Sequence, residues 1–177
     1  MDAKTGQVLL QKNMYEKEYP ASITKILTTA LGLTYAKPED RITVSQETVS
    51  DVWKWGETTH LALEPGEIIT LKDALYGAMV ESANDCANAI AQAVSGSLTD
   101  FAELMNQQVA ALGLSDTHFT NAHGLPDKDH YTTAYDMARI TRWAMTVPGF
   151  EEYFCATEYT IPKTNKKDVA RNIGTHH

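Results

Sequence analysis

The stretch Pro20-Ala-Ser-Ile-Thr-Lys-Ile-Leu-Thr-Thr-Ala-Leu-Gly32 places a serine and a lysine at the head of an apolar helix. The periodicity predicts a helix over residues 23–31 that stops at Gly32. Ser22 and Lys25 are three positions apart, so the amine can reach the hydroxyl. The positive end of the helix dipole favours an alkoxide, and in a partly desolvated, positive site it also favours a neutral amine. These residues predict a Ser-Lys nucleophile. Chance also produces this spacing, so a capped helix start with a solvated lysine is the alternative.

A second candidate site is Ser82-Ala-Asn84, which separates two predicted helices. Thr70 and Asp73 form a capping-box pair that starts the first helix, which runs to about residue 80, and the second covers residues 86–94 before Gly96. A hydroxyl and a carboxamide on a rigid turn can relay a proton and bind a substrate amide. Serine and asparagine are also common turn residues, so a purely structural role is the alternative.

Farther from these motifs, the pattern predicts a mostly helical chain with a few short strands. Residues 2–6 form a predicted turn, residues 7–11 and 42–44 form predicted short strands, and residues 53–62 form an aromatic, irregular stretch. Further helices are predicted over residues 101–112, ending at Gly113, and over residues 133–143. A polar loop over residues 121–131 lies between them.

Size and charge limit the possible function. A chain of 177 residues with 43% hydrophobic and 21% charged residues is expected to form one compact domain. The net charge of -8 argues against nucleic acid or anionic lipid as a partner, because phosphates are bound by clustered lysines and arginines. No stretch approaches the roughly 20 apolar residues of a membrane span, and the first residues do not form a signal peptide.

Histidines and acidic residues cluster in the polar loop, but their spacing does not predict a metal site. The cluster comprises His118, His123, His130, Asp127 and Asp129, without the spacing of a known ligand motif. We expect no metal and no other cofactor. Hydrogen bonds from His123 are expected to order the loop.

Other conspicuous residues are expected to have structural roles. Trp53 and Trp55, with His60, can form a ligand platform, but large aromatic residues more often pack in a core or at a lobe boundary, which we expect for these. Cys86 and Cys155 are expected to be small apolar filler, and the sequence leaves open whether they pair. No site is assigned to the terminal residues His176 and His177.

Five blocks of sequence follow one another along nearly the whole chain. They are Asp2-Ala-Lys-Thr-Gly-Gln-Val-Leu, Tyr19-Pro-Ala-Ser-Ile-Thr-Lys, Leu75-Tyr-Gly, Glu81-Ser-Ala-Asn-Asp and His118-Phe-Thr-Asn-Ala-His-Gly-Leu-Pro. In these blocks and their order, the chain resembles the D-alanyl-D-alanine carboxypeptidases among the low-molecular-mass penicillin-binding proteins. This ordered agreement is more specific than either short motif.

The resemblance implies a fold and a set of roles. The fold is α/β, of the serine β-lactamase and transpeptidase type, with an incomplete antiparallel sheet packed with a mainly helical lobe and Ser22 at their junction. Residues 1–177 would form part of a penicillin-binding catalytic domain that lacks the start of its first strand and its last sheet strands. Ser22 would be the acylated nucleophile and Lys25 its proton acceptor, with Ser82 and Asn84 as the second motif.

The implied third motif, Lys-Thr-Gly, is missing from this sequence. Lys163-Thr164 is followed by Asn165, and this segment resembles one upstream of the true motif. We therefore do not expect Lys163 to substitute for it. Loss of that strand would remove a cation for the substrate carboxylate and a donor of the oxyanion hole, where one donor is worth roughly 10²–10³ in rate. The chain is then an inactive fragment, is completed by another chain, or is one part of a longer protein whose remainder carries the motif.

The resemblance implies a serine-type D-Ala-D-Ala carboxypeptidase that shortens peptidoglycan stem peptides through an acyl-enzyme on Ser22. β-Lactam antibiotics would be covalent inhibitors, and the site would face the extracytoplasmic cell envelope. A serine β-lactamase is one alternative, although no carboxylate dedicated to deacylation is evident. A noncatalytic module that binds peptidoglycan or acts as a scaffold is the other.

Overall fold

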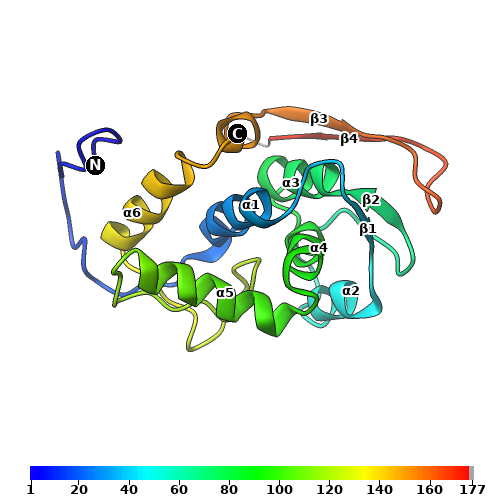
Figure 1. Ribbon diagram of the computed structural model, residues 1–177. Helices are drawn as coiled ribbons and strands as arrows, with labels where there is room; N and C mark the ends of the chain where they lie inside the picture. The colour runs from blue at the N-terminus through cyan, green and yellow to red at the C-terminus, as the bar shows by residue number, and fades with distance from the viewer. Residues whose placement is uncertain (176–177) are drawn as a thin grey trace.

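The first long helix, α1 (Thr24–Tyr35), forms the centre of the molecule, with α3, α4, α5 and α6 packed around it (Figure 1). The computed structural model describes residues 1–175; His176 and His177 lie outside the described residues. The other elements are η1 (Ala21–Ile23), β1 (Arg41–Thr43), α2 (Gln46–Trp53), β2 (Ile68–Thr70), α3 (Leu71–Val80), α4 (Asn84–Ser95), α5 (Leu98–Ala111), α6 (Ala134–Ala144), α7 (Phe150–Phe154), β3 (Glu158–Ile161) and β4 (Arg171–Gly174).

Helix α1 separates two parts of the hydrophobic core. Leu27 and Leu31 are fully buried against α4, α5 and α6, and Ala30 packs toward α7. The predicted stop at Gly32 is wrong, because the helix continues to Tyr35. Gly32 is instead a packing position: a Cβ there would lie 2.9 Å from a methyl group of Ile90 on α4. The missing side chain therefore lets the two helices approach closely.

The predicted helix boundaries that depend on local capping are confirmed. Thr70 and Asp73 form a complete capping box at the start of α3. Helix α4 ends at Gly96, which has φ of 78° and donates its N–H to Gln92 O. Helix α5 ends just before Gly113, which has φ of 69°. Glycine suits both positions because it adopts a left-handed backbone without steric cost.

Helix α2 was not predicted, and its position corrects the interpretation of the tryptophans. Ser45 caps the helix by accepting a hydrogen bond from Thr48 N. Trp53 at its last turn is 49% exposed and Trp55 is 42% exposed, so the expectation that they pack in a core is wrong. The buried side of α2 is formed by Thr48, Val49 and Val52, which leaves the Trp53 ring on the outer side.

The strands form two small antiparallel pairs. Ile42 of β1 lies opposite Ile69 of β2, and Tyr159 of β3 lies opposite Ile173 of β4. The predicted strand over residues 7–11 is wrong: within the described residues it pairs with no strand, and Leu9 is 69% exposed. An apolar run becomes a strand only where a neighbour accepts and donates its backbone hydrogen bonds.

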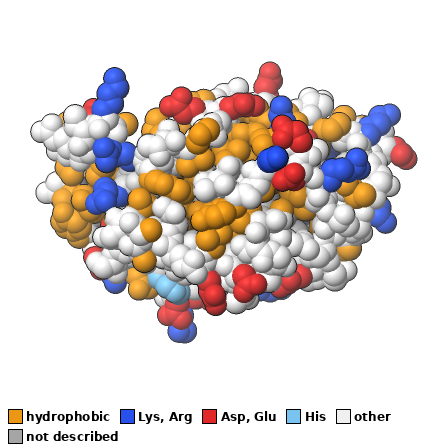
Figure 2. All heavy atoms as spheres, in the orientation of Figure 1, with side chains coloured by type: hydrophobic (Ala, Val, Ile, Leu, Met, Phe, Trp, Pro, Cys, Tyr) orange, Lys and Arg blue, Asp and Glu red, His pale blue; other side chains and the backbone are white. Residues whose placement is uncertain are grey.

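The overall architecture agrees with the predicted one, a mainly helical lobe with an incomplete antiparallel sheet. On the face drawn in Figure 2, hydrophobic side chains gather over the middle, in the region of α1, and most charged side chains lie around them. Cys86 is buried in the core, as expected, whereas Cys155 is exposed, and both thiols are free. Among the described helices, none is long and apolar enough to cross a membrane.

Candidate active site

Ser22 lies in a tight turn at the entrance to α1. The turn is the 3-10 helix η1, and Ala21 directly before the serine has a φ of 49°, which is unusual for a residue with a side chain. Ser22 is exposed and lines a pocket of about 340 Å³ together with Asn84 and His123. The nucleophile candidate is therefore accessible to a ligand.

The Lys25 amine is buried directly beneath this serine. Only 2% of the Lys25 surface is exposed, and its Nζ lies 3.3 Å from Ser22 Oγ. Nζ also lies 2.8 Å from Asn84 Oδ1 and 2.8 Å from the backbone oxygen of His123. The amine therefore joins three segments that are far apart in the sequence: the start of α1, the start of α4 and the loop over residues 121–131.

Burial is the main reason that the pKa of the Lys25 amine is low. Desolvation lowers the pKa of Lys25 from 10.5 to about 7, against the opposing influence of Cys86 and Asp85. A neutral amine has two N–H donors and one lone pair. If the donors serve Asn84 and His123, the lone pair is left for the Ser22 hydroxyl, which then donates to Nζ.

The two residues of the second motif are placed differently. Asn84 is the first residue of α4, is buried, and contacts Lys25 directly. Ser82 has a left-handed backbone with φ of 58° in the connection between α3 and α4. Within residues 1–175, its hydroxyl makes no hydrogen bond to Ser22, Lys25 or Asn84. The geometry thus brings three of the four predicted site residues together, whereas Ser82 is not among the residues that line the pocket.

The loop over residues 121–131 closes against the serine turn at Gly124. Its φ is 91°, and a Cβ at this position would lie 1.9 Å from the Ala21 carbonyl oxygen. Asn121 Oδ1 holds the loop by accepting the N–H of Gly124 at 2.7 Å. The close approach requires glycine, because any side chain would collide with the backbone of η1.

Hydrogen bonds with its neighbours hold His123 in one tautomer. These bonds also tie the loop over residues 121–131 in place, which is the role expected for His123. Its Nδ1 accepts a hydrogen bond from the Leu125 N–H at 3.1 Å, so the proton lies on Nε2. Nε2 then donates to Asp51 Oδ2 at 2.9 Å. Desolvation lowers the pKa of His123 and outweighs the opposing effect of Asp51, so the ring is neutral at neutral pH.

A second loop, over residues 57–63, forms another wall of the pocket. Asp85, fully buried at the start of α4, accepts hydrogen bonds from the backbone N–H groups of Leu61 and Leu63. The Asn84 N–H donates to Thr59 O at 2.9 Å. The N-terminal turn of α4 therefore fixes this wall, which carries Glu57, Thr58 and Thr59 to the pocket.

The remaining candidates lie outside the centre of the site. His130 lines the pocket, but its Nε2 bonds Thr24 Oγ1 at 2.9 Å, and desolvation lowers the pKa of His130 to about 4. Lys163 lies in the β3–β4 connection and is not among the residues that line the pocket. Across residues 1–175, no group of three His, Cys, Asp or Glu side chains is arranged to hold a metal ion.

An exposed serine above a buried lysine with a lowered pKa is the arrangement found in serine hydrolases that use lysine as their base. The family model described as D-alanyl-D-alanine carboxypeptidase, of the S11 peptidases, matches residues 1–175. The chain therefore belongs to this family, which confirms the resemblance derived from the sequence blocks.

Individual relatives agree with this assignment. The chain is 35% identical over 173 residues to D-alanyl-D-alanine carboxypeptidase DacF of Bacillus subtilis, covering 94% of this chain and 43% of DacF. Penicillin binding protein 6B of Escherichia coli matches with a TM-score of 0.88 and 27% identity, over 100% of this chain and 56% of that one. A mutant of Streptomyces K15 DD-transpeptidase matches with a TM-score of 0.89 and 25% identity, over 99% and 71%.

These matches confirm the serine β-lactamase and transpeptidase fold, of which the helical lobe and the two strand pairs are a part. The chain spans about half the length of the curated relatives that it matches. Asp51, Asp85 and Gly124 are contacts of the site that the sequence motifs did not single out. Of these, Asp85 and Gly124 lay within blocks that carried the resemblance, whereas Asp51 lay in none.

Proposed function

We propose that this chain carries the acylation centre of a serine-type D-Ala-D-Ala carboxypeptidase, with Ser22 as nucleophile and Lys25 as its general base. The observation that supports it most directly is the buried Nζ of Lys25, 3.3 Å from Ser22 Oγ and with a pKa lowered to about 7. The proposed substrate is the D-Ala-D-Ala end of a peptidoglycan stem peptide, met in the extracytoplasmic cell envelope. Membership of the family and the accessible pocket support this choice.

In the proposed reaction, Lys25 Nζ takes the Ser22 hydroxyl proton while Oγ attacks the carbonyl carbon of the penultimate D-alanine. The peptide C–N bond then breaks, and the proton passes to the leaving nitrogen, so that D-alanine departs as an amine. Water later attacks the ester on Ser22 and releases the shortened peptide. Asn84 and the carbonyl of His123 orient the amine through both steps. The role of Ser82 as part of the second motif rests on the family resemblance alone.

A penicillin tests the proposal because its strained amide acylates the same serine. The 177-residue chain is incubated with benzylpenicillin, and its intact mass is compared with that of Ser22→Ala. We expect one covalent equivalent on the parent chain and none on the variant. A persistent adduct supports the carboxypeptidase, and rapid loss with turnover of the antibiotic favours a β-lactamase. No adduct, with muropeptide still bound, favours the noncatalytic module and contradicts the proposal.

The lowered pKa of Lys25 predicts a pH dependence. If neutral Lys25 is the base, the rate of acylation should rise about tenfold per pH unit below pH 7 and level off above it. The rate rises with pH because the protonated amine has no lone pair to accept the serine proton. The rate is measured by quenching the reaction at timed intervals and determining the amount of adduct by mass spectrometry, at several pH values. A flat profile between about pH 5 and 9 would contradict the role of Lys25.

A further inference from the structure

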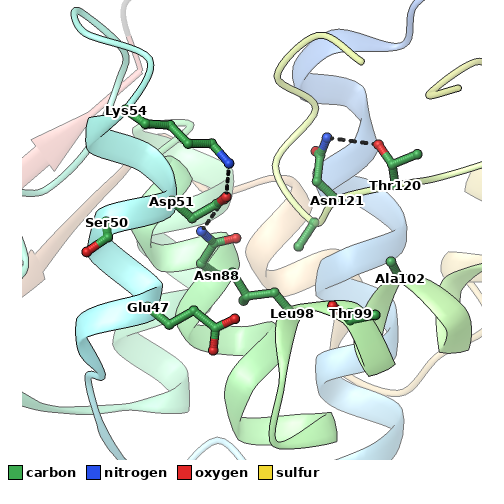
Figure 3. Close-up of a pocket in the computed structure, with 11 residues that line it drawn as sticks. Glu47, Ser50, Asp51, Lys54, Asn88, Leu98, Thr99, Ala102, Thr120 and Asn121 are labelled. Atoms are coloured by element: carbon green, nitrogen blue, oxygen red, sulfur yellow. Dashed lines mark hydrogen bonds and ion pairs between the residues drawn. The ribbon is translucent and has the colours of Figure 1, made fainter. Parts of the chain in front are cut away.

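A second pocket lies directly behind the loop that holds Lys25. It has a volume of about 460 Å³ and is bounded by α2, α4, α5 and the start of the loop over residues 121–131. Figure 3 shows Asp51 projecting from α2 toward the middle of this pocket, where Lys54 and Asn88 contact it. Asp51 connects this pocket to the serine site through His123.

The connection runs from Asp51 to Lys25 through a single residue. Asp51 Oδ2 accepts the His123 Nε2–H at 2.9 Å, and the same oxygen accepts Asn88 Nδ2 at 3.1 Å. The backbone oxygen of His123 lies 2.8 Å from Lys25 Nζ. The His123 side chain is 2% exposed, so in the folded chain its Nε2–H is shielded from bulk water and paired with the Asp51 carboxylate.

We propose that Asp51 is a positioning residue for the Lys25 base, acting by fixing the tautomer and the place of His123. The expected effect on catalysis rests on the proposed function. The contacts between Asp51, His123 and Lys25 do not depend on it. A neutral ring with its Nδ1 occupied by Leu125 N–H needs an acceptor at Nε2, and Asp51 provides it. Without that acceptor the buried N–H is unpaired, and the ring and its backbone are expected to shift.

The charged groups around the relay come from several elements. Asp51 of α2, Lys54 at the C-cap of α2 and Lys25 of α1 act on His123. His123 in turn acts on His130 of the loop. Asp85 and Cys86 of α4 act on Lys25. Hydrogen bonds from His123, Lys54 and Asn88 hold the pKa of Asp51 below its usual range, so it stays ionised at every pH at which Lys25 titrates.

The test compares Asp51→Ala, Asp51→Asn and Glu47→Gln. Glu47 is an exposed carboxylate that lines the same pocket without touching His123, so it controls for charge. Ring ¹⁵N spectra report the tautomer of His123, and NMR titration of labelled lysine reports the pKa of Lys25. In Asp51→Ala we expect a mixture of tautomers and a lower pKa for Lys25, because the protonated amine loses a fixed acceptor.

Acylation by benzylpenicillin is expected to slow by about 10²-fold in Asp51→Ala, as for a misplacement of about 1 Å in a catalytic group. Asp51→Asn keeps an acceptor for the Nε2–H and should retain the tautomer, with a smaller fall in the pKa of Lys25. Glu47→Gln should match the parent chain. If Asp51→Ala does not fold by circular dichroism, Asp51→Asn decides the matter through the pKa of Lys25, which should still fall, and an unchanged pKa would contradict the inference.

An unchanged tautomer and an unchanged Lys25 pKa in the folded Asp51 variants would overturn the inference. The NMR measurements do not need an acylated protein. If the parent chain forms no adduct but both signals respond to Asp51, the proposed function fails while the coupling stands. If the adduct forms at the same rate in all variants, Asp51 does not position the base.

Discussion

Replacing Lys25 by methionine is expected to lower the rate of Ser22 acylation by about 10³-fold, the range typical for loss of a general base. Methionine fills a similar volume but has no lone pair on nitrogen to accept the serine proton. The buried position of Lys25 means that solvent cannot easily replace it as the base. The rate is measured from the growth of the benzylpenicillin adduct by intact mass spectrometry.

Lys37→Met is the matched control, because Lys37 is exposed, follows the far end of α1 and is not among the residues that line the serine pocket. Its acylation rate should equal that of the parent chain. Lys25→Met also leaves Asn84 Oδ1 and the His123 carbonyl without their donor, so thermal unfolding must show that it is folded. A folded Lys25→Met protein that acylates at the parent rate would show that another group removes the proton.

Replacing Gly124 by alanine is expected to give the largest structural effect. The new Cβ would lie 1.9 Å from the Ala21 oxygen, and the φ of 91° is strained for any residue with a side chain. Strain and overpacking together should lower the free energy of unfolding by about 3 kcal/mol or more. That corresponds to a fall of roughly 6–12 °C in melting temperature for a domain of this size.

The control is Gly96→Ala, which separates the two causes. Gly96 also has a positive φ, 78°, but a Cβ there would meet no atom within 4 Å. Its loss of stability should be clearly smaller, because only the backbone strain remains. Equal melting temperatures for the two variants, measured by calorimetry, would contradict the close approach of the loop to η1.

The parts of the site that the sequence predicted are those set by short-range geometry. Ser22 and Lys25 are one turn apart, so their contact needs only a helical start to α1. The lowered pKa of Lys25, in contrast, depends on burial by α4 and the loop over residues 121–131. The sequence favoured a neutral lysine from the helix dipole together with partial desolvation, and desolvation is the first cause in the folded chain.

Packing decided what the local pattern could not. Glycine is a residue type that often ends a helix, so Gly32 was a predicted stop. Helix α1 continues past it because Ile90 and Leu75 pack into the space left by its missing side chain. Residues 7–11 have the apolar content of a strand, but in residues 1–175 no strand pairs with them. Both errors arise because the end of a helix, or the formation of a strand, can depend on a packing or pairing partner that is far away in the sequence.

The sequence by itself determined the family, the capped helices and the serine-lysine pair, since each depends on residues a few positions apart or on blocks in a fixed order. Only the tertiary structure decided the surroundings of that pair. Asp51 and His123 are 72 positions apart, and Lys25 and His123 are 98 positions apart. Such contacts have no local pattern, because they exist only once the hydrophobic core has placed α1, α2 and the loop against one another.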